Sequence, residues 1–148
     1  MDDLLVLARR MMLRAHAPYS KFHVGAALRA ADGSIHGGCN VENAAYPQGL
    51  CAEAGAIAAL VAAGHRRILE CVVVGPGPEV ITPCGGCRQK LREFAADDVP
   101  VHLCGPDGLH RTVTLGQLLP LSFGPQHVAQ PCAKLSRARP RDSGRRSP

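Results

Sequence analysis

Aromatic side chains are scarce in this chain of 148 residues, which contains three Phe, two Tyr and no Trp. Alanine, valine and leucine must therefore supply most of the apolar core. No apolar run approaches the roughly 20 residues that cross a bilayer, so the sequence indicates no membrane span. The first residues, MDDLLVLARRMML, begin acidic and lack a small-residue cleavage site, so we expect no signal peptide and a cytoplasmic location.

A disulfide framework is also not expected. The chain is long enough to bury a core without covalent staples. In a reducing compartment, cysteine thiols serve more often as metal ligands or reactive groups than as disulfide partners. The seven cysteines are therefore candidate ligands.

The net charge of +5 arises from residues 132–148, which carry six Lys and Arg residues against one Asp. The rest of the chain is neutral, which disfavours nucleic-acid binding because that usually needs a basic groove. The basic segment is poor in apolar residues, so we expect a disordered, solvated extension. An arm for nucleic acid or an acidic partner is the alternative, although no aromatic residue stands there to stack on bases. We therefore expect one folded domain over 1–128 and a basic tail over 129–148.

Helical and strand patterns alternate along the chain. Apolar residues at helical spacing predict helices over 2–16, 51–64 and 84–95. The predicted strands are 22–30, 35–41, 71–75, 99–104 and a short edge strand at 109–114. This order predicts an α/β fold, a three-layer α/β/α sandwich around a single mixed sheet of about five strands.

Cys84 and Cys87 form a C-x-x-C pair with two glycines between them, at the start of a predicted helix. A lone C-x-x-C pair also suits a redox site or half of a structural zinc site. Cys51 stands at the equivalent place before another predicted helix, which gives three thiolate ligands. Three protein ligands with one open position are typical of catalytic zinc. A structural zinc with Cys39 or Cys104 as the fourth ligand is the alternative.

Glu53 follows Cys51 by two residues, close enough to face the same site without binding the metal. A carboxylate beside zinc-bound water can accept its proton and deliver it elsewhere. The helix starts favour thiolates as well, because exposed N–H groups and the positive end of the helix dipole lie there.

These motifs resemble those of a known family. C-A-E followed by P-C-G-G-C matches the signature of the zinc-dependent nucleobase deaminases. The stretches APYSKFHVGAAL, GCNVENAAYPQGLCAE, PCGGCRQ and LLPLSFGP, in this order, are similar to cytidine deaminases of the small, homotetrameric, three-cysteine type. The resemblance covers about residues 1–128.

The resemblance implies a role for particular residues. One zinc ion per subunit would be bound by Cys51, Cys84 and Cys87, and Glu53 would carry protons while hydroxide attacks C4 of cytosine. The implied substrate contacts are Asn40 and Glu42 to the ribose hydroxyls, Phe22 and Val24 near the base and sugar, the backbone of Ala52 at the base edge, and Tyr46 and Phe123 at sites shared between subunits. The implied assembly is a homotetramer.

One residue departs from the family pattern. Relatives often have an arginine directly after the catalytic glutamate, where this chain has Ala54. Three thiolates on Zn²⁺ leave a net negative charge, which raises the pKa of bound water unless something offsets it. Here the offset must come from the helix N-termini, from backbone N–H groups or from Arg88. Our hypothesis is that Arg88 provides more of it, because Ala54 cannot.

The leading interpretation is hydrolytic deamination of free cytidine and 2′-deoxycytidine in pyrimidine salvage. A deaminase for another aminopyrimidine, such as a nucleoside antibiotic or a base in a polynucleotide, is an alternative enzyme. A decayed deaminase that only binds is an alternative of another class, and the presence of Glu53 argues against it.

Deletion of residues 132–148 should leave deaminase activity intact, because the family motifs end before this segment. Truncation before Leu118 should instead give inactive, dissociated protein, because it removes LLPLSFGP. Activity assays and light scattering on both truncations test this pair of predictions, and active monomers from the shorter chain would contradict the shared site.

Overall fold

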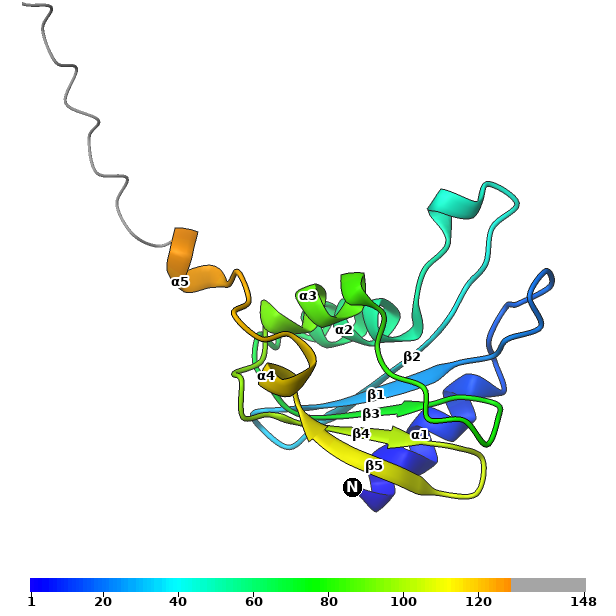
Figure 1. Cartoon of the computed structure of the whole chain (residues 1–148), viewed down its shortest axis with the longest axis horizontal. Helices are drawn as coiled ribbons and strands as arrows, with labels where there is room; N and C mark the ends of the chain where they lie inside the picture. The colour runs from blue at the N-terminus through cyan, green and yellow to red at the C-terminus, as the bar shows by residue number, and fades with distance from the viewer. Residues whose placement is uncertain (129–148) are drawn as a thin grey trace, which may run out of the picture.

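Five strands form one sheet in the order β2-β1-β3-β4-β5 in the computed structural model, which describes residues 1–128 (Figure 1). β3 and β4 are parallel, and every other neighbouring pair is antiparallel. The strands are β1 (Gly25–Ala30), β2 (Ile35–Cys39), β3 (Ile68–Val74), β4 (Pro100–Cys104) and β5 (Leu109–Thr114). The predicted tail over 129–148 lies outside the described residues, so the division of the chain stays a prediction.

Helices cover both faces of this sheet (Figure 1). α1 (Asp2–Met12) lies on one face, and α2 (Ala52–Ala62) and α3 (Gly85–Arg92) lie on the other. The shorter helices are η1 (Tyr46–Gln48), α4 (Leu115–Leu118) and α5 (Pro125–Val128). The predicted three-layer sandwich around a mixed five-stranded sheet is confirmed. No helix within residues 1–128 is both long enough and apolar enough to cross a bilayer.

The central strand β3 is buried on both faces because its side chains alternate between two cores. Val72 and Val74 pack with Leu4 of α1, whereas Cys71 and Val73 belong to the larger core under α2 and α3. A period of two along a strand places neighbouring residues on opposite faces. The uninterrupted run of apolar residues is therefore typical of a strand covered on both sides.

Helix α2 lies unusually close to β2 because Gly38 has no side chain. A Cβ atom at Gly38 would come within 2.2 Å of the backbone nitrogen of Ala56 and 2.4 Å of the carbonyl oxygen of Ala52. The first turn of α2 therefore rests on the backbone of β2. This contact brings the start of α2 next to the end of β2, where Asn40 follows.

Several elements differ from their predicted bounds: α3 ends at Arg92 rather than at 95, β2 ends at Cys39 rather than at 41, and β3 begins at Ile68 rather than at 71. α1 and β1 are also shorter than predicted, and both give way to hydrogen bonds with Asn40. Residues 13–16 leave α1, and His16 donates a backbone hydrogen bond to the carbonyl of Asn40. β1 begins at Gly25 rather than at residue 22, because the backbone N–H of Val24 donates to the side chain of Asn40. Hydrogen bonds to the backbone of Asn40 and to its side chain thus replace regular helix and strand pairing.

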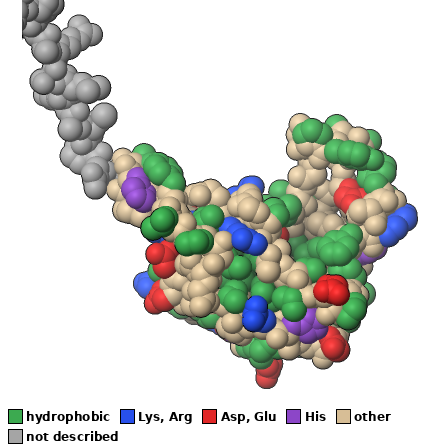
Figure 2. Space-filling view, viewed as in Figure 1, with side chains coloured by type: hydrophobic (Ala, Val, Ile, Leu, Met, Phe, Trp, Pro, Cys, Tyr) green, Lys and Arg blue, Asp and Glu red, His purple; other side chains and the backbone are tan. Residues whose placement is uncertain are grey.

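Segments 17–24 and 41–50 extend beyond the end of the sheet (Figure 1). In Figure 2 the loop that contains η1 stands clear of the rest of the domain, with hydrophobic side chains at its tip. Tyr19 and Tyr46 connect the two segments through an edge-to-face contact, with ring centroids 5.9 Å apart. The two segments therefore form one protruding unit beside the carboxyl end of β3.

Replacement of Gly38 by alanine should lower the free energy of unfolding by about 3 kcal/mol, because the new methyl group meets helix backbone that cannot move aside. Urea denaturation of the zinc-loaded protein measures this change. Gly77→Ala is the matched control, because the nearest atom to its Cβ is 3.9 Å away. Equal stability of the two variants would show that α2 does not rest on β2 as described.

Candidate metal centre and substrate pocket

Three sulfur atoms converge at one point of the structure. The Sγ atoms of Cys51, Cys84 and Cys87 all lie within 4.8 Å of one another, and those of Cys51 and Cys84 are 3.8 Å apart. Within residues 1–128 this is the one cluster of three or more His, Cys, Asp or Glu ligand atoms at such distances. Cys104 lies in the core under α1, on the opposite face of the sheet. Neither Cys39 nor Cys104 joins the cluster, so a four-cysteine site has no support.

Two helix N-termini bring the sulfurs together. Cys51 is the N-cap residue of α2, and Cys84 is the N-cap residue of α3, both with extended backbone. Pro83 precedes the second cap, and Cys87 lies in the first turn of α3, fully buried. The unpaired N–H groups and the helix dipole at each start favour negative charge on these sulfurs.

The environments of the three thiols differ. Burial raises the pKa of Cys87, and the nearby charge of Glu53 raises it further. Burial also raises the pKa of Cys51. Burial opposes ionisation of Cys84 too, but hydrogen bonds from the backbone and thiol of Cys87 lower its pKa. The metal-free site therefore holds protons that a cation must displace, which couples metal affinity to pH.

The donor set fits zinc. Zn²⁺ binds thiolates tetrahedrally, and three protein ligands leave one position for a water molecule or substrate. Cys51 and Cys84 are exposed on the side that faces the pocket, so the cluster is open there. Glu53 lies in the first turn of α2 and is only 4 % exposed. A buried carboxylate next to an open metal position is suited to proton transfer.

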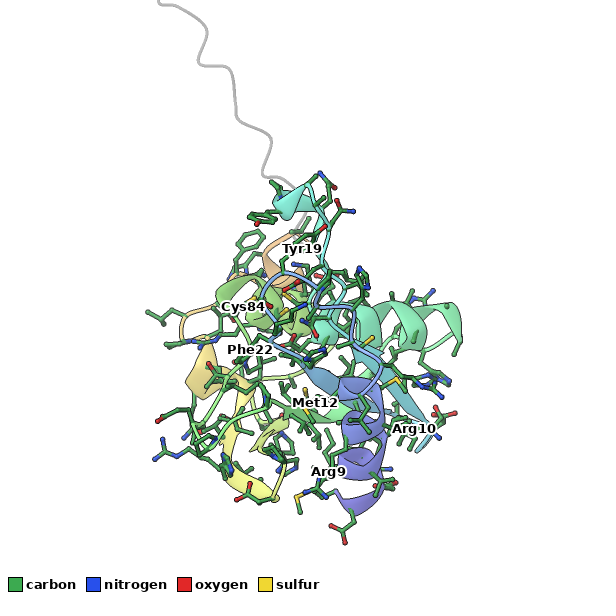
Figure 3. The ribbon with its side chains drawn as sticks, turned by 90° about the vertical axis from the view of Figure 1, so that its right-hand side faces the viewer. Arg9, Arg10, Met12, Tyr19, Phe22 and Cys84 are labelled. Atoms are coloured by element: carbon green, nitrogen blue, oxygen red, sulfur yellow. The ribbon has the colours of Figure 1, made fainter. Side chains whose placement is uncertain are left out.

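A cavity of about 590 Å³ opens in front of the sulfurs. It contains the two exposed cysteines, Glu53 and most of the predicted substrate contacts. Figure 3 labels Phe22 and Cys84 at this end of the domain, on different segments, with Tyr19 in the protruding unit beyond them. The residues that line the cavity are Ser20, Phe22, Val24, Asn40, Glu42, Cys51, Ala52, Glu53, Val73, Ile81, Thr82 and Cys84.

Asn40 and Glu42, the predicted sugar-binding pair, also form hydrogen bonds to residues 19–24, which precede β1. Asn40 accepts a hydrogen bond from the N–H of Val24 at 2.8 Å, and its amide donates to the carbonyl of Phe22 at 2.8 Å. Glu42 accepts from the backbone of Tyr19 at 2.9 Å and of Ser20 at 3.2 Å. Each side chain retains hydrogen-bonding capacity toward the cavity, because an amide has two hydrogens and a carboxylate accepts about four bonds.

Tyr46 and Phe123 do not line this cavity in the single chain. Tyr46 is 76 % exposed and lines a neighbouring cavity with Tyr19, Ser20 and Glu42, while Phe123 is 62 % exposed and stacks on His127. Their predicted roles involve a second subunit, so these roles stay predictions.

Arg88 makes contacts that the sequence did not indicate. Its guanidinium donates to the carbonyls of Pro83 at 2.7 Å and Leu118 at 3.0 Å, and to the hydroxyl of Thr82 at 2.8 Å. None of these hydrogen bonds ends on a cysteine sulfur. Arg88 therefore ties the segment before Cys84 to α4, and its part in offsetting the thiolate charge stays a prediction.

Sequence reasoning missed several residues of the cavity. Ser20, Val73, Ile81 and Thr82 line it, but none carries a pattern of its own. Ser20 belongs to the stretch APYSKFHVGAAL, which carries the family resemblance but indicates no role for this serine. Its partner Glu42 is 22 positions further along the chain, so only the folded structure shows their contact.

A family model for the zinc-binding region of cytidine and deoxycytidylate deaminases matches residues 1–103. A cytidine deaminase from Sporosarcina psychrophila is 38% identical over 128 residues, which cover 86% of this chain and 94% of the relative. The chain belongs to the cytidine deaminase family. A cytidine deaminase from Mycobacterium tuberculosis (strain CDC 1551 / Oshkosh) is 42% identical over 110 residues, covering 74% of this chain and 79% of the relative.

Solved structures agree with this family assignment. The crystal structure of cytidine deaminase from Burkholderia pseudomallei has a TM-score of 0.78 and 41% sequence identity, and the match covers 82% of this chain and 98% of that chain. The structure of cytidine deaminase from Mycobacterium tuberculosis has a TM-score of 0.73 and 39% identity, over 83% and 96% of the two chains. The resemblance to a three-cysteine zinc deaminase, with its fold and its cofactor, is therefore confirmed.

Cys87→Ala should lower the zinc content of the purified protein from about one ion per chain to a small fraction, because two thiolates hold the metal poorly. Elemental analysis after gel filtration gives the stoichiometry. Cys104→Ala is the control, since this cysteine is equally buried but lies on the other face of the sheet. Full zinc in the Cys87 variant, or loss in the control alone, would contradict the site.

Proposed function

We propose that this protein is a zinc-dependent hydrolase that deaminates free cytidine and 2′-deoxycytidine to uridine and 2′-deoxyuridine. The observation that carries the proposal is the position of Glu53, buried beside an open set of three cysteine sulfurs in a cavity that also contains Asn40 and Glu42. Deamination of free nucleosides serves their reuse, so the reaction belongs to pyrimidine salvage. The six cysteines of residues 1–128 are free thiols, which supports a reducing compartment such as the cytoplasm.

Each group has a defined task in this reaction. Zinc, when bound, supplies a Lewis acid and lowers the pKa of a water molecule toward about 7. Glu53 takes a proton from the attacking water and delivers it to N3 of the pyrimidine ring. Water adds at C4, and Glu53 then takes the remaining proton from the new C4 hydroxyl and passes it to the amine. The C4–N bond breaks as the C4 carbonyl forms. Cytidine and water thus give uridine and ammonia.

The charges around the cavity favour an uncharged nucleoside over a nucleotide. No Lys or Arg lines this cavity among residues 1–128, while Glu42 and Glu53 both do. Phosphate recognition usually uses arginine or lysine, and the two helix N-termini at this cavity already carry the cysteine sulfurs. Two carboxylates also oppose the negative charge of a phosphate monoester. The neutral domain also offers no basic groove for a polynucleotide. Deoxycytidylate and bases in nucleic acid are therefore disfavoured substrates.

We also propose a homotetramer with active sites shared between subunits. The outward side of α2 carries Ala58 and Ala62, and the one charged residue of the helix, Glu53, is buried. A helix without polar residues on its outward side is normally buried. Tyr46 and Phe123 are large exposed side chains near the pocket entrance and the C-terminal segment. A neighbouring subunit that covers these surfaces would also narrow the open cavity.

Purified zinc-loaded protein should convert cytidine to uridine, which the fall in ultraviolet absorbance of the base reports. Glu53→Gln should keep zinc and lower kcat by about 10²–10⁴-fold, the usual contribution of a positioned acid–base group. Glu93→Gln is the matched control, because Glu93 is exposed at the far end of α3.

Two outcomes would contradict the proposal. Normal turnover by the Glu53 variant would remove the proton carrier from the mechanism. A zinc-loaded protein without turnover of cytidine would favour another aminopyrimidine substrate or a protein kept for binding.

A further inference from the structure

The hydroxyl of Ser20 joins two walls of the cavity. It donates a hydrogen bond to Oε1 of Glu42, on the sugar side, and accepts one from the backbone N–H of Phe22 at 3.0 Å, on the base side. The backbone N–H groups of Tyr19 and Ser20 bond the other carboxylate oxygen, Oε2. Both oxygens of Glu42 are therefore held by one short turn of the chain.

This turn has an unusual backbone. Lys21, between Ser20 and Phe22, has a φ of 59°, in the left-handed region that non-glycine residues seldom adopt. Left-handed residues persist where the surrounding contacts determine them. Here those contacts are the hydrogen bonds of Ser20, together with the bond between the ring of His23 and the carbonyl of Lys21 at 3.0 Å.

We propose that Ser20 is a positioning residue for sugar recognition, which orients the carboxylate of Glu42 and, through the same oxygen, the backbone of Phe22. This inference rests on the proposed function and deepens it. Nothing in the motifs for zinc or proton transfer requires a hydroxyl at this position. Ser20 lines the cavity on the side where Asn40 and Glu42 lie. The hydrogen bond from Ser20 leaves Glu42 able to accept a further bond from a substrate hydroxyl.

The Ser20 hydroxyl affects how Glu42 binds the sugar of the substrate. With Ser20 in place, Oε1 of Glu42 is fixed, so a sugar hydroxyl meets an acceptor that is already oriented. Without the hydroxyl, the carboxylate keeps its two backbone bonds on Oε2 but loses the bond that sets its rotation. Preorganisation of this kind changes substrate affinity, whereas C4 of the base reacts at the other end of the cavity.

Ser20→Ala should therefore raise KM for cytidine about tenfold and leave kcat within about twofold, a loss comparable to one hydrogen bond to a charged group. Ser20→Thr retains a hydroxyl on the same carbon and should restore most of the affinity. Ser34→Ala is the matched control: Ser34 also donates to a carboxylate two residues away, Asp32 at 2.7 Å, but in the β1–β2 turn outside the cavity.

Substrates that lack one sugar hydroxyl sharpen the test. In the wild type, 2′-deoxycytidine or 3′-deoxycytidine should have a higher KM than cytidine, depending on which hydroxyl Glu42 accepts. In Ser20→Ala, the ratio of the KM for the deoxynucleoside to the KM for cytidine should fall toward one, because the oriented acceptor on Glu42 is already lost. An unchanged ratio, a kcat that falls more than KM rises, or a Thr variant no better than Ala would overturn the proposal.

A second readout does not depend on the substrate. The hydrogen bond from Ser20 lowers the pKa of Glu42, with smaller contributions from the backbone of residues 19–20 and from His16. NMR titration of the Glu42 carboxyl should show this pKa rise in Ser20→Ala and stay unchanged in Ser34→Ala. A wild type without cytidine turnover would contradict the proposed function, while an unmoved Glu42 pKa would contradict the Ser20 contact itself.

Discussion

The convergence of two helix N-termini governs the rest of this structure. α2 and α3 begin at neighbouring points on the same face of the sheet, each with a cysteine at its N-cap. α2 reaches this point because Gly38 lets its first turn rest on the backbone of β2. α3 reaches it because the parallel strands β3 and β4 place the intervening helix over the same face, with its start beyond the carboxyl end of β3. The sheet thus determines where the three sulfurs meet.

The electrostatics of the centre follow from the same arrangement. Three thiolates and a buried carboxylate, Glu53, concentrate negative charge in a small volume, and Ala54, directly after Glu53, has no charge to offset it. Arg88 directly follows Cys87 in the sequence, but the hydrogen bonds of its side chain go to Thr82, Pro83 and Leu118. The helix N-termini place favourable charge at the sulfurs, and a bound metal ion would add its own. A contribution of Arg88 to this offset stays a prediction.

Much of the fold and of the metal site could be predicted from the sequence, because the patterns that indicate them are local. The C-x-x-C pair, the C-x-E motif and the apolar run of β3 each involve residues a few positions apart, and helix starts and strand burial follow from such patterns. Element boundaries were less predictable: those of α1, α3, β1, β2 and β3 differ from the predicted ones. For α1 and β1 the reason is that Asn40 hydrogen-bonds segments that lie 16 or more positions before it. Ser20 was missed for the same reason, and the contacts of Arg88 depend on α4, 30 positions further on.

We infer that three cysteine sulfurs bind one zinc ion and leave a position open toward the cavity. X-ray absorption spectroscopy at the zinc edge of the zinc-loaded protein tests this claim directly, because it counts sulfur and lighter ligands. We expect three sulfurs at about 2.3 Å and one oxygen or nitrogen ligand at about 2.0 Å. Four sulfurs, or fewer than three, would contradict it.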